Sequence, residues 1–568
     1  MSAEPLDVVL CWHMHQPQYR DAITHEYRLP WTYLHAIKDY TDMAAHLEAN
    51  PGAKAVVNFV PILLDQIADY TTQINAYQQQ QQPLRDPLLQ ALVSDVVATD
   101  TDRQFSLIKA CLRANQERQI TPYPDFAQLV EHAKWLIEHP FAIRHVNAQF
   151  LADLVVWYHL AWLGYSVRCS SATIKQLIDK ARGFTLQDRR ALLAVIGKSI
   201  ATIIPRYRLL AERQQVELSL TPYAHPILPL LLDFSVAKES MPEVTLPTTP
   251  AYPHGYARAR WHIEQGFRSF TTHFGMRPAG CWPAEGAVSD ATLRLLNEYD
   301  IRWVASGQAV LRNSLDFDGI TRANPHYCIH RAYQLQGTQT KCFFRDDGLS
   351  DFIGFQYATW HADDAVANLL HHLENIAANC ADTPGSIVSI IMDGENAWEY
   401  YPENGFYFLN ALYQKLSAHP KLRLTTYTEH LQRTTTSQNL SHLVAGSWVY
   451  GTLSTWIGDK DKNHAWEMLV EAKLQFDEVV AAHCLTAQQL KLAEQQLAIC
   501  EGSDWFWWLG DYNPESTVSD FEQLFRQNLS NLYTCLQLVP PSYLSDTFAH
   551  GSGSPAQGGV MRRGTPTT

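Results

Sequence analysis

Short apolar runs alternate with longer stretches of helical periodicity along most of the chain. Eight of the apolar runs are too short for helices and are expected to be buried strands: residues 7–12, 53–60, 215–220, 278–282, 302–305, 341–344, 386–392 and 423–426. Apolar strands that alternate with helices are typical of a parallel sheet covered by helices. Seven or eight such strands would close into a barrel.

Two regions depart from this alternation. Residues 83–213 show a continuous helical pattern, which predicts a long helical insertion in a barrel domain of residues 1–435. The pattern is helical again over residues 436–545, where we expect a C-terminal domain that contributes to the cleft. Residues 546–568 are rich in Gly, Ser and Pro and are expected to form a disordered tail.

Polar side chains stand where the predicted strands end. The residues assigned to these ends are His13, His15, Glu217, Glu285, Arg345 and Asp393. In parallel barrels the chemistry takes place at the carboxyl ends of the strands. The shared placement therefore indicates an enzyme site better than any single residue does.

Two of the strand ends carry a carboxylate close to a Trp. Glu285 follows Gly-Cys-Trp-Pro-Ala, and Asp393 opens the stretch Asp-Gly-Glu-Asn-Ala-Trp398. Cleavage of a glycosidic bond needs two carboxylates in one cleft, and an aromatic face suits a sugar ring. Either carboxylate alone would more simply cap a helix or form a turn, but their matching contexts favour catalysis. Spacing alone does not decide between Asp393 and Glu395.

Together with Trp12-His-Met-His-Gln-Pro17, these motifs make the chain resemble glycoside hydrolase family 57, which comprises α-amylases, 4-α-glucanotransferases and glucan branching enzymes. The resemblance covers roughly residues 7–540. It implies an incomplete (β/α)7 TIM-like barrel and a retaining enzyme that acts on α-1,4-glucans such as glycogen, starch or maltodextrin. It also implies Glu285 as the nucleophile and Asp393 as the acid/base. The motifs do not separate hydrolysis from transfer to another glucan.

Substrate contacts are expected from aromatic and polar residues of the same motifs. The set is His13, His15, Trp31, Glu217, His225, Trp282, Arg345, Asp351, Trp398, Trp448 and Trp456. Glu217 on an inward-facing strand position would bury a charge at a cost on the order of several kcal/mol, so it needs either a structural ion pair or a substrate contact. Trp448 and Trp456 stand in a stretch rich in Gly, Ser and Thr, which favours a cleft position. The aromatic run at 504–508 is instead expected to pack the C-terminal helices against the barrel.

Two further segments bear on the site. Arg345 can hold a carboxylate through two N–H groups, and Glu285 is a candidate partner. Residues 303–308 read Trp-Val-Ala-Ser-Gly-Gln, where members of the family often carry acidic residues. This departure leaves the catalytic pair untouched and puts the outer sugar subsites in question.

The composition narrows the class of protein. A net charge of −14 without a Lys/Arg cluster argues against nucleic-acid binding. No apolar run reaches the roughly 18 residues that span a bilayer, and the N-terminus lacks the basic and apolar regions of a signal peptide. A cytoplasmic protein without membrane contact is therefore expected, with an α-glucan as its partner and its oligomeric state left open. Ten scattered Cys without a Cys-x-x-Cys pair are expected to be buried thiols.

Two alternatives remain. Metal-dependent glycosidases and deacetylases use related barrels, and the pair His13-x-His15 could hold a metal ion because residues i and i+2 share a strand face. The metal content of the purified protein would discriminate. A non-catalytic glycan-binding protein would be expected to lack one of the two carboxylates, yet both are present. The preferred interpretation is an enzyme that needs neither a metal nor another cofactor.

Overall fold

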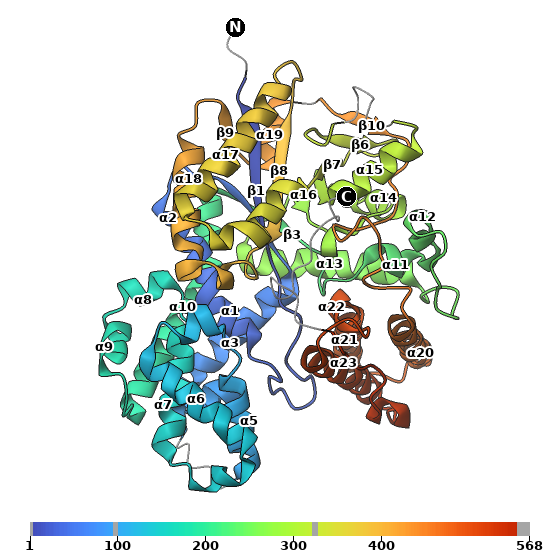
Figure 1. Cartoon of the computed structure of the whole chain (residues 1–568). Helices are drawn as coiled ribbons and strands as arrows, with labels where there is room; N and C mark the ends of the chain where they lie inside the picture. The colour runs from blue at the N-terminus through green and yellow to red at the C-terminus, as the bar shows by residue number, and fades with distance from the viewer. Residues whose placement is uncertain (1–3, 95–99, 321–327, 435, 554–568) are drawn as a thin grey trace.

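The computed structural model of the chain describes residues 4–94, 100–320, 328–434 and 436–553 (Figure 1). A ten-stranded sheet forms its centre, in the order β10-β6-β7-β5-β4-β3-β2-β1-β8, with β9 paired to β1. The described pairings are parallel except that of β6 with β7. The strands are β1 (Leu6–Met14), β2 (Ala55–Phe59), β3 (Val216–Leu220), β4 (Gly280–Cys281), β5 (Trp303–Ser306), β6 (Tyr333–Leu335), β7 (Lys341–Phe344), β8 (Ile387–Asp393), β9 (Leu422–Leu424) and β10 (Gln438–Leu440).

Seven of the parallel strands, β1 to β5 with β7 and β8, form the incomplete (β/α)7 barrel that the family resemblance implies. Strands β7 and β8 meet through a single bridge between Arg345 and Ser389. Inside the barrel, the ring of Tyr427 packs against the rings of Trp303 and Phe343. The barrel interior is therefore a packed core, and only its carboxyl end is available for chemistry.

Strand periodicity delivers polar groups to that carboxyl end. Val9 and Cys11 of β1 belong to the interior apolar cluster, and His13 continues the same face because side chains alternate along a strand. Ile391 of β8 belongs to the same cluster, and Asp393 follows it in the same way. His13 and Asp393 are direct partners in the β1–β8 pairing. Two residues predicted for the site thus stand side by side at the barrel mouth.

All eight predicted strands are present, and their ends differ from the prediction by at most two residues. Strands β6 and β10 were not predicted. Each has three residues and lies at the edge of the sheet beyond β7. Three residues are too few to show a period of two, so the sequence carries no signal for them.

Helices cover the outside of the barrel and form two further lobes. The helices between barrel strands are α1 (Trp31–His35), α2 (Thr41–Ala49), α3 (Pro61–Gln80), α11 (Leu228–Leu232), α12 (Ala237–Ser240), α13 (Gly255–Phe274), α14 (Asp290–Asn297), α15 (Gln308–Phe317), α16 (Asp347–Asp351), α17 (Ala362–Asn379) and α18 (Phe406–Ser417), with α19 (Tyr427–Arg433) after β9. The predicted insertion holds α4 (Pro87–Val93), α5 (Thr101–Cys111), α6 (Pro124–Glu138), α7 (Ala148–Trp162), α8 (Tyr165–Ser170), α9 (Ala172–Lys180) and α10 (Leu186–Glu212). The C-terminal helices are α20 (Lys460–Ala481), α21 (Ala487–Cys500), α22 (Ser503–Trp508) and α23 (Glu515–Cys535).

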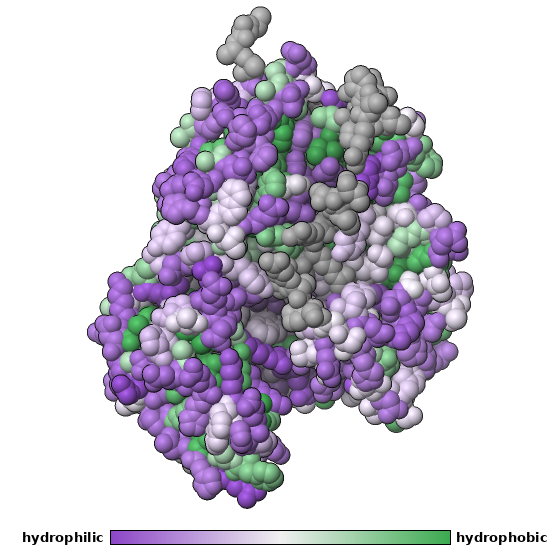
Figure 2. Space-filling view, viewed as in Figure 1, coloured by the Kyte–Doolittle hydropathy of each residue, from purple (hydrophilic) through white to green (hydrophobic). Residues whose placement is uncertain are grey.

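The two lobes lie beside each other below the sheet in Figure 1, with the insertion helices α5 to α9 on one side and α20 to α23 on the other. The surface is hollowed between them (Figure 2). Within the described part of the chain, no helix combines the length and apolar character needed to cross a membrane.

A buried ion pair attaches the C-terminal lobe to the barrel. Glu501 accepts hydrogen bonds from Arg258 at 2.8 Å, from His262 at 2.7 Å and from the Tyr252 hydroxyl at 2.7 Å. Burial by itself would raise the pKa of Glu501, but Arg258 and His262 outweigh it and hold the pKa at about 2. Helix α22 begins at Ser503, two residues after Glu501, so the ion pair of Glu501 with Arg258 and His262 holds the start of α22 against the barrel.

The last described residues are held against the C-terminal lobe. The Ser552 N–H donates to the carbonyl oxygen of Asp511 at 2.9 Å, and the Gly553 N–H donates to that of Asn513 at 3.0 Å. Ser552 and Gly553, which belong to the tail predicted to be disordered, are thus hydrogen-bonded to the segment after α22. Residues 554–568 lie outside the described residues.

Candidate active site

A cleft of about 1060 Å³ opens at the carboxyl ends of the strands, between the two helical lobes. Eight of the predicted site residues line it: His13, His15, Trp31, His225, Glu285, Arg345, Asp393 and Trp448. The insertion contributes Arg113, Asn115 and Gln119 to the walls. The C-terminal lobe contributes residues of α22 and of the segments before and after this helix in the sequence. The cleft is therefore built by all three parts of the fold.

Glu285 stands in a tight turn after β4. Its φ is 59°, and that of Gly286 is also 59°. The left-handed region costs a non-glycine residue about 1–3 kcal/mol when the surroundings impose it. Trp448 supplies part of that restraint, because its backbone N–H donates to the Glu285 carbonyl at 3.1 Å and its indole N–H donates to Oε2 at 3.0 Å. The carboxylate is therefore aimed by its turn and by Trp448 together.

The segment 303–308 supports this turn. The Ser306 hydroxyl donates to the Gly286 carbonyl at 2.6 Å. Gly307 lies so close to Trp448 that an added Cβ would be 2.5 Å from the Trp448 Cα. The side chain of Gln308 accepts a hydrogen bond from the Asp347 N–H at 3.2 Å. These residues do not line the cleft, so they act on the site through the position of the turn.

Asp393 is the last residue of β8 and carries the second carboxyl group. Desolvation raises its pKa to about 6, although the Asn396 amide donates to Oδ2 at 2.8 Å and opposes the rise. Burial and the nearby Asp393 also raise the pKa of Glu395 well above its ordinary value. Glu395 accepts hydrogen bonds from the backbone N–H of His15 and the side chain of Gln16, both at 3.3 Å. This part of the cleft favours protonated carboxyl groups.

A chain of hydrogen bonds joins two neutral imidazoles below Glu285. His13 Nδ1 lies 2.7 Å from the Asn58 carbonyl oxygen, which only accepts, so Nδ1 carries the proton. His13 Nε2 then accepts from His225 Nε2 at 3.2 Å, and His225 Nδ1 accepts from the Ser503 hydroxyl at 2.8 Å. Burial lowers the pKa of His13 to about 3 and that of His225 well below its ordinary value. Both rings are neutral at physiological pH.

His15 belongs to a different cluster. Its ring stacks on that of His225 with centroids 3.9 Å apart, and its Nε2 lies 2.9 Å from an oxygen of Asp504. The donor atoms of His15, His225 and Asp504 lie within 4.8 Å of one another, a spacing that could hold a metal ion. The pair predicted from sequence, His13-x-His15, is not the pair that converges, because His13 is engaged with Asn58.

Arg345 is held between two carboxylates. It donates to Asp347 at 2.7 Å and to Asp351 at 2.8 Å, and its guanidinium lies 5.6 Å from the centroid of the Trp448 ring. Asp351 does not line the cleft. Its carboxylate accepts a hydrogen bond from Arg345, and the Arg345 guanidinium lies beside the Trp448 indole, so Asp351 can act on the site through these two groups.

Glu217 lies outside the lining of the cleft. It is the second residue of β3, so it lies near the amino end of the strand and away from the cleft. Its carboxylate accepts from the Trp303 indole at 2.7 Å and from the backbone N–H and hydroxyl of Thr428 at 2.9 and 2.6 Å. The sequence predicted a buried charge here, whereas Glu217 is half-buried and its carboxylate is satisfied by neutral donors at the base of the barrel.

Three of the Trp residues predicted to contact substrate also lie outside the lining of the cleft. Trp282, Trp398 and Trp456 are fully buried and do not line the cleft. Trp282 packs under Trp448 with ring centroids 5.2 Å apart, and Trp456 packs against Trp507 at 5.9 Å. These large apolar rings gain more by filling the core behind the wall than by facing water.

The contribution of α22 to the cleft wall was not predicted from the sequence. Asp504, Trp507 and Trp508 line the cleft, whereas Trp505 and Phe506 are buried as the packing prediction required. Positions i, i+3 and i+4 share one helix face. In the aromatic run, this spacing separates the residues that line the cleft from those that fill the core.

Comparisons with known proteins agree on the fold. A family model described as Glycosyl hydrolase family 57 matches residues 9–441. The solved α-amylase AmyC from Thermotoga maritima aligns with a TM-score of 0.56 at 12% identity, over 94% of this chain and 93% of that one. A family 57 branching enzyme from Thermococcus kodakaraensis gives 0.54 at 14% identity, over 94% and 89% of the two chains. A 4-α-glucanotransferase from Thermococcus litoralis gives 0.51 at 12% identity, over 93% and 60%. No curated protein matches the chain by sequence.

Proposed function

Because the chain belongs to glycosyl hydrolase family 57, we propose that it is a retaining enzyme that cleaves α-1,4-glucans by double displacement. The observation that carries this proposal is that two carboxyl groups line one cleft in unlike surroundings. Glu285 accepts an indole N–H, whereas desolvation raises the pKa of Asp393 to about 6. Unlike surroundings of this kind separate an ionised nucleophile from a protonated acid.

In the first step, a carboxylate oxygen of Glu285 attacks the anomeric carbon. Asp393 donates its proton to the glycosidic oxygen, the bond between that oxygen and the anomeric carbon breaks, and the leaving sugar departs as an alcohol. The product is a glycosyl ester of Glu285. Asp393 is left as a carboxylate and is ready to act as a base.

In the second step, Asp393 takes a proton from an incoming hydroxyl group. The oxygen of that group attacks the anomeric carbon, and Glu285 is released as a carboxylate. Water as the acceptor gives hydrolysis, and a glucan hydroxyl gives transfer. The two outcomes share the same catalytic pair and differ in how well the acceptor side of the cleft excludes water.

The walls of the cleft support a sugar substrate. Trp31, Trp448, Trp507 and Trp508 offer aromatic faces along it. His15 Nδ1 is a buried nitrogen without a hydrogen-bond partner, and a sugar hydroxyl would supply one. The α-amylase, branching enzyme and 4-α-glucanotransferase that align over most of this chain support an α-glucan as the substrate.

The two roles are tested with α-maltosyl fluoride, because fluoride leaves without a general acid. Asp393→Ala should retain the first step, and added azide should accept the sugar from the ester to give an α-glycosyl azide. Glu285→Ala should lose turnover, and azide in place of the carboxylate should give the β-glycosyl azide. The same azide anomer from both variants would contradict the assignment. Glu395→Gln serves as the matched control and should keep activity on maltoheptaose.

Hydrolysis and transfer are separated on maltoheptaose and amylose by following reducing ends together with product lengths. New reducing ends in proportion to bonds cleaved mean hydrolysis. Redistribution of chain lengths at a constant number of reducing ends means transfer. Both reactions must disappear in Glu285→Ala, and activity that survives in this variant would refute the nucleophile. Activity that is lost on removal of metal by a chelator would favour the metal-dependent alternative at His15, His225 and Asp504.

A further inference from the structure

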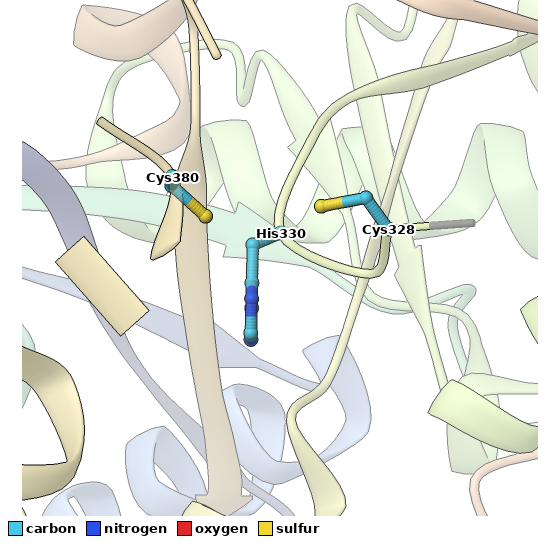
Figure 3. A group of neighbouring side chains, drawn as sticks. All are labelled: Cys328, His330 and Cys380. Carbon is cyan, nitrogen blue, oxygen red and sulfur yellow. The ribbon is translucent and has the colours of Figure 1, made fainter. Parts of the chain in front are cut away.

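Two groups of metal-type donors occur among the described residues. One belongs to the cleft described above. The other lies outside it and consists of Cys328, His330 and Cys380, whose two sulfurs and one imidazole nitrogen lie within 4.8 Å of one another (Figure 3). None of these three residues lines the cleft or has a part in the glycosidic chemistry.

The fold holds the three side chains together from separate segments. Cys328 and His330 precede β6, and Cys380 follows the last residue of α17. The Ile387 N–H at the start of β8 donates to the His330 carbonyl at 3.0 Å, which fixes the backbone of this segment against the sheet. The sulfurs of Cys328 and Cys380 lie within 4.8 Å of each other and flank the His330 side chain in Figure 3.

A carboxylate orients the imidazole. His330 Nε2 lies 2.9 Å from Oδ2 of Asp346, and the pair is largely shielded from solvent. Since a carboxylate only accepts, Nε2 carries the proton and Nδ1 keeps its lone pair. Asp346 is itself fixed, because its N–H donates to the Ser389 carbonyl at 2.8 Å and its Oδ1 accepts from the Leu349 N–H at 2.9 Å. Histidines that bind metals are held by carboxylates in this same arrangement.

We propose that Cys328, Cys380 and His330 form a binding site for a soft divalent cation, with Zn²⁺ as the preferred ion. Two thiolates and one imidazole are a ligand set that favours Zn²⁺ over Mg²⁺ or Ca²⁺. The three residues are half-buried, so water can take the fourth position. Binding displaces the two thiol protons, and the resulting thiolates neutralise the charge of the ion. The bound ion would tie the end of α17 to the segment before β6.

The site is tested with Co²⁺ added to the full-length protein after reduction and removal of metal. Only a site with cysteine ligands gives thiolate-to-cobalt charge-transfer absorption, so the histidines and Asp504 of the cleft do not contribute to this signal. We expect one Co²⁺ per chain with this absorption and its displacement by Zn²⁺. Cys328→Ser and Cys380→Ser should each abolish the band. Asp346→Asn, which keeps a residue able to cap α16, should weaken binding by about 10- to 100-fold.

The exposed thiols of Cys169 and Cys484 provide matched controls. Cys169→Ser and Cys484→Ser should leave the Co²⁺ signal and its stoichiometry unchanged. Zn²⁺ should also protect Cys328 and Cys380, and not Cys484, from alkylation as measured by mass spectrometry. A reduced protein that gives no charge-transfer band, or a band that survives both Cys328→Ser and Cys380→Ser, overturns the proposal. Reduced thiols that bind no metal but form a Cys328–Cys380 disulfide on oxidation would replace it with a redox pair. These results do not depend on glycan turnover.

Discussion

Replacing Glu501 by Gln tests how the C-terminal lobe is held. The pKa of Glu501 is about 2 in the folded protein, against an ordinary value of 4.5, and a difference of this size corresponds to about 3 kcal/mol of stability. Breaking a buried ion pair costs about 3–5 kcal/mol, since Arg258 would remain buried without its partner. For a cooperative unit of this size, 1 kcal/mol corresponds to about 1 °C in Tm. Glu501→Gln should therefore lower Tm by about 3–5 °C, and by more if the C-terminal lobe unfolds separately.

The pH dependence supplies an independent check. Because the folded pKa lies below the unfolded one, the contribution of Glu501 is complete above about pH 4.5 and is lost as the pH falls through about 2. The difference in stability between wild type and Glu501→Gln should therefore shrink as the pH is lowered from 5 towards 2, in thermal or urea unfolding. Glu212→Gln removes an exposed pair with Arg208 and should cost less than about 1 kcal/mol. Equal effects of the two substitutions, or a pH-independent difference, would refute the reasoning.

Three predictions concern the cleft. Trp448→Phe removes the indole N–H that donates to the Glu285 carboxylate. We expect kcat/KM to fall about 10-fold, because a hydrogen bond to a charged group contributes roughly 1.5 kcal/mol or more. An unchanged rate on maltoheptaose would contradict this role of Trp448. Asp393 must be protonated to act as the acid, so kcat/KM should fall as the pH rises above about 6, and a pH–rate profile without that limb would exclude a general acid with this pKa. Gly307→Ala should push Trp448 away and lower kcat/KM by about 10- to 100-fold. Gly52→Ala is the control, because an added Cβ there meets only ordinary van der Waals contacts, and it should have no effect in the same assay.

The barrel could be predicted because its strands are apolar on both faces. Such runs differ clearly from the helical segments between them, and the polar residue after each run indicates the carboxyl end of the strand. Glu217 shows the limit of this reasoning. A carboxylate in an apolar strand could not be assigned to one end of the barrel from sequence, because its donors Trp303 and Thr428 come from β5 and from α19, far along the chain.

Aromatic residues were harder to predict for a related reason. A Trp near a catalytic motif can line the cleft or fill the core behind the residue that lines it, and local composition is the same in both cases. Trp448 lines the cleft, and Trp282 and Trp456 lie behind the wall. In α22 the opposite difference occurs: Trp507 was expected to pack in the core but lines the cleft, whereas Trp505 is buried. The position of each residue on the helix distinguishes the two, and the local composition does not.

The protonation states in the cleft have a common cause. Desolvation is the largest influence on the pKa of Asp393, Glu395, His13 and His225, and it acts against charge in every case. It raises the two carboxyl pKa values and lowers the two imidazole values, so uncharged groups gather around Glu285. A glucan seated in the cleft would remove more water and push these groups further in the same direction. Substrate binding would therefore favour the protonated form of Asp393 that the proposed first step needs. A cleft wall held in place by the C-terminal lobe is a condition for this effect.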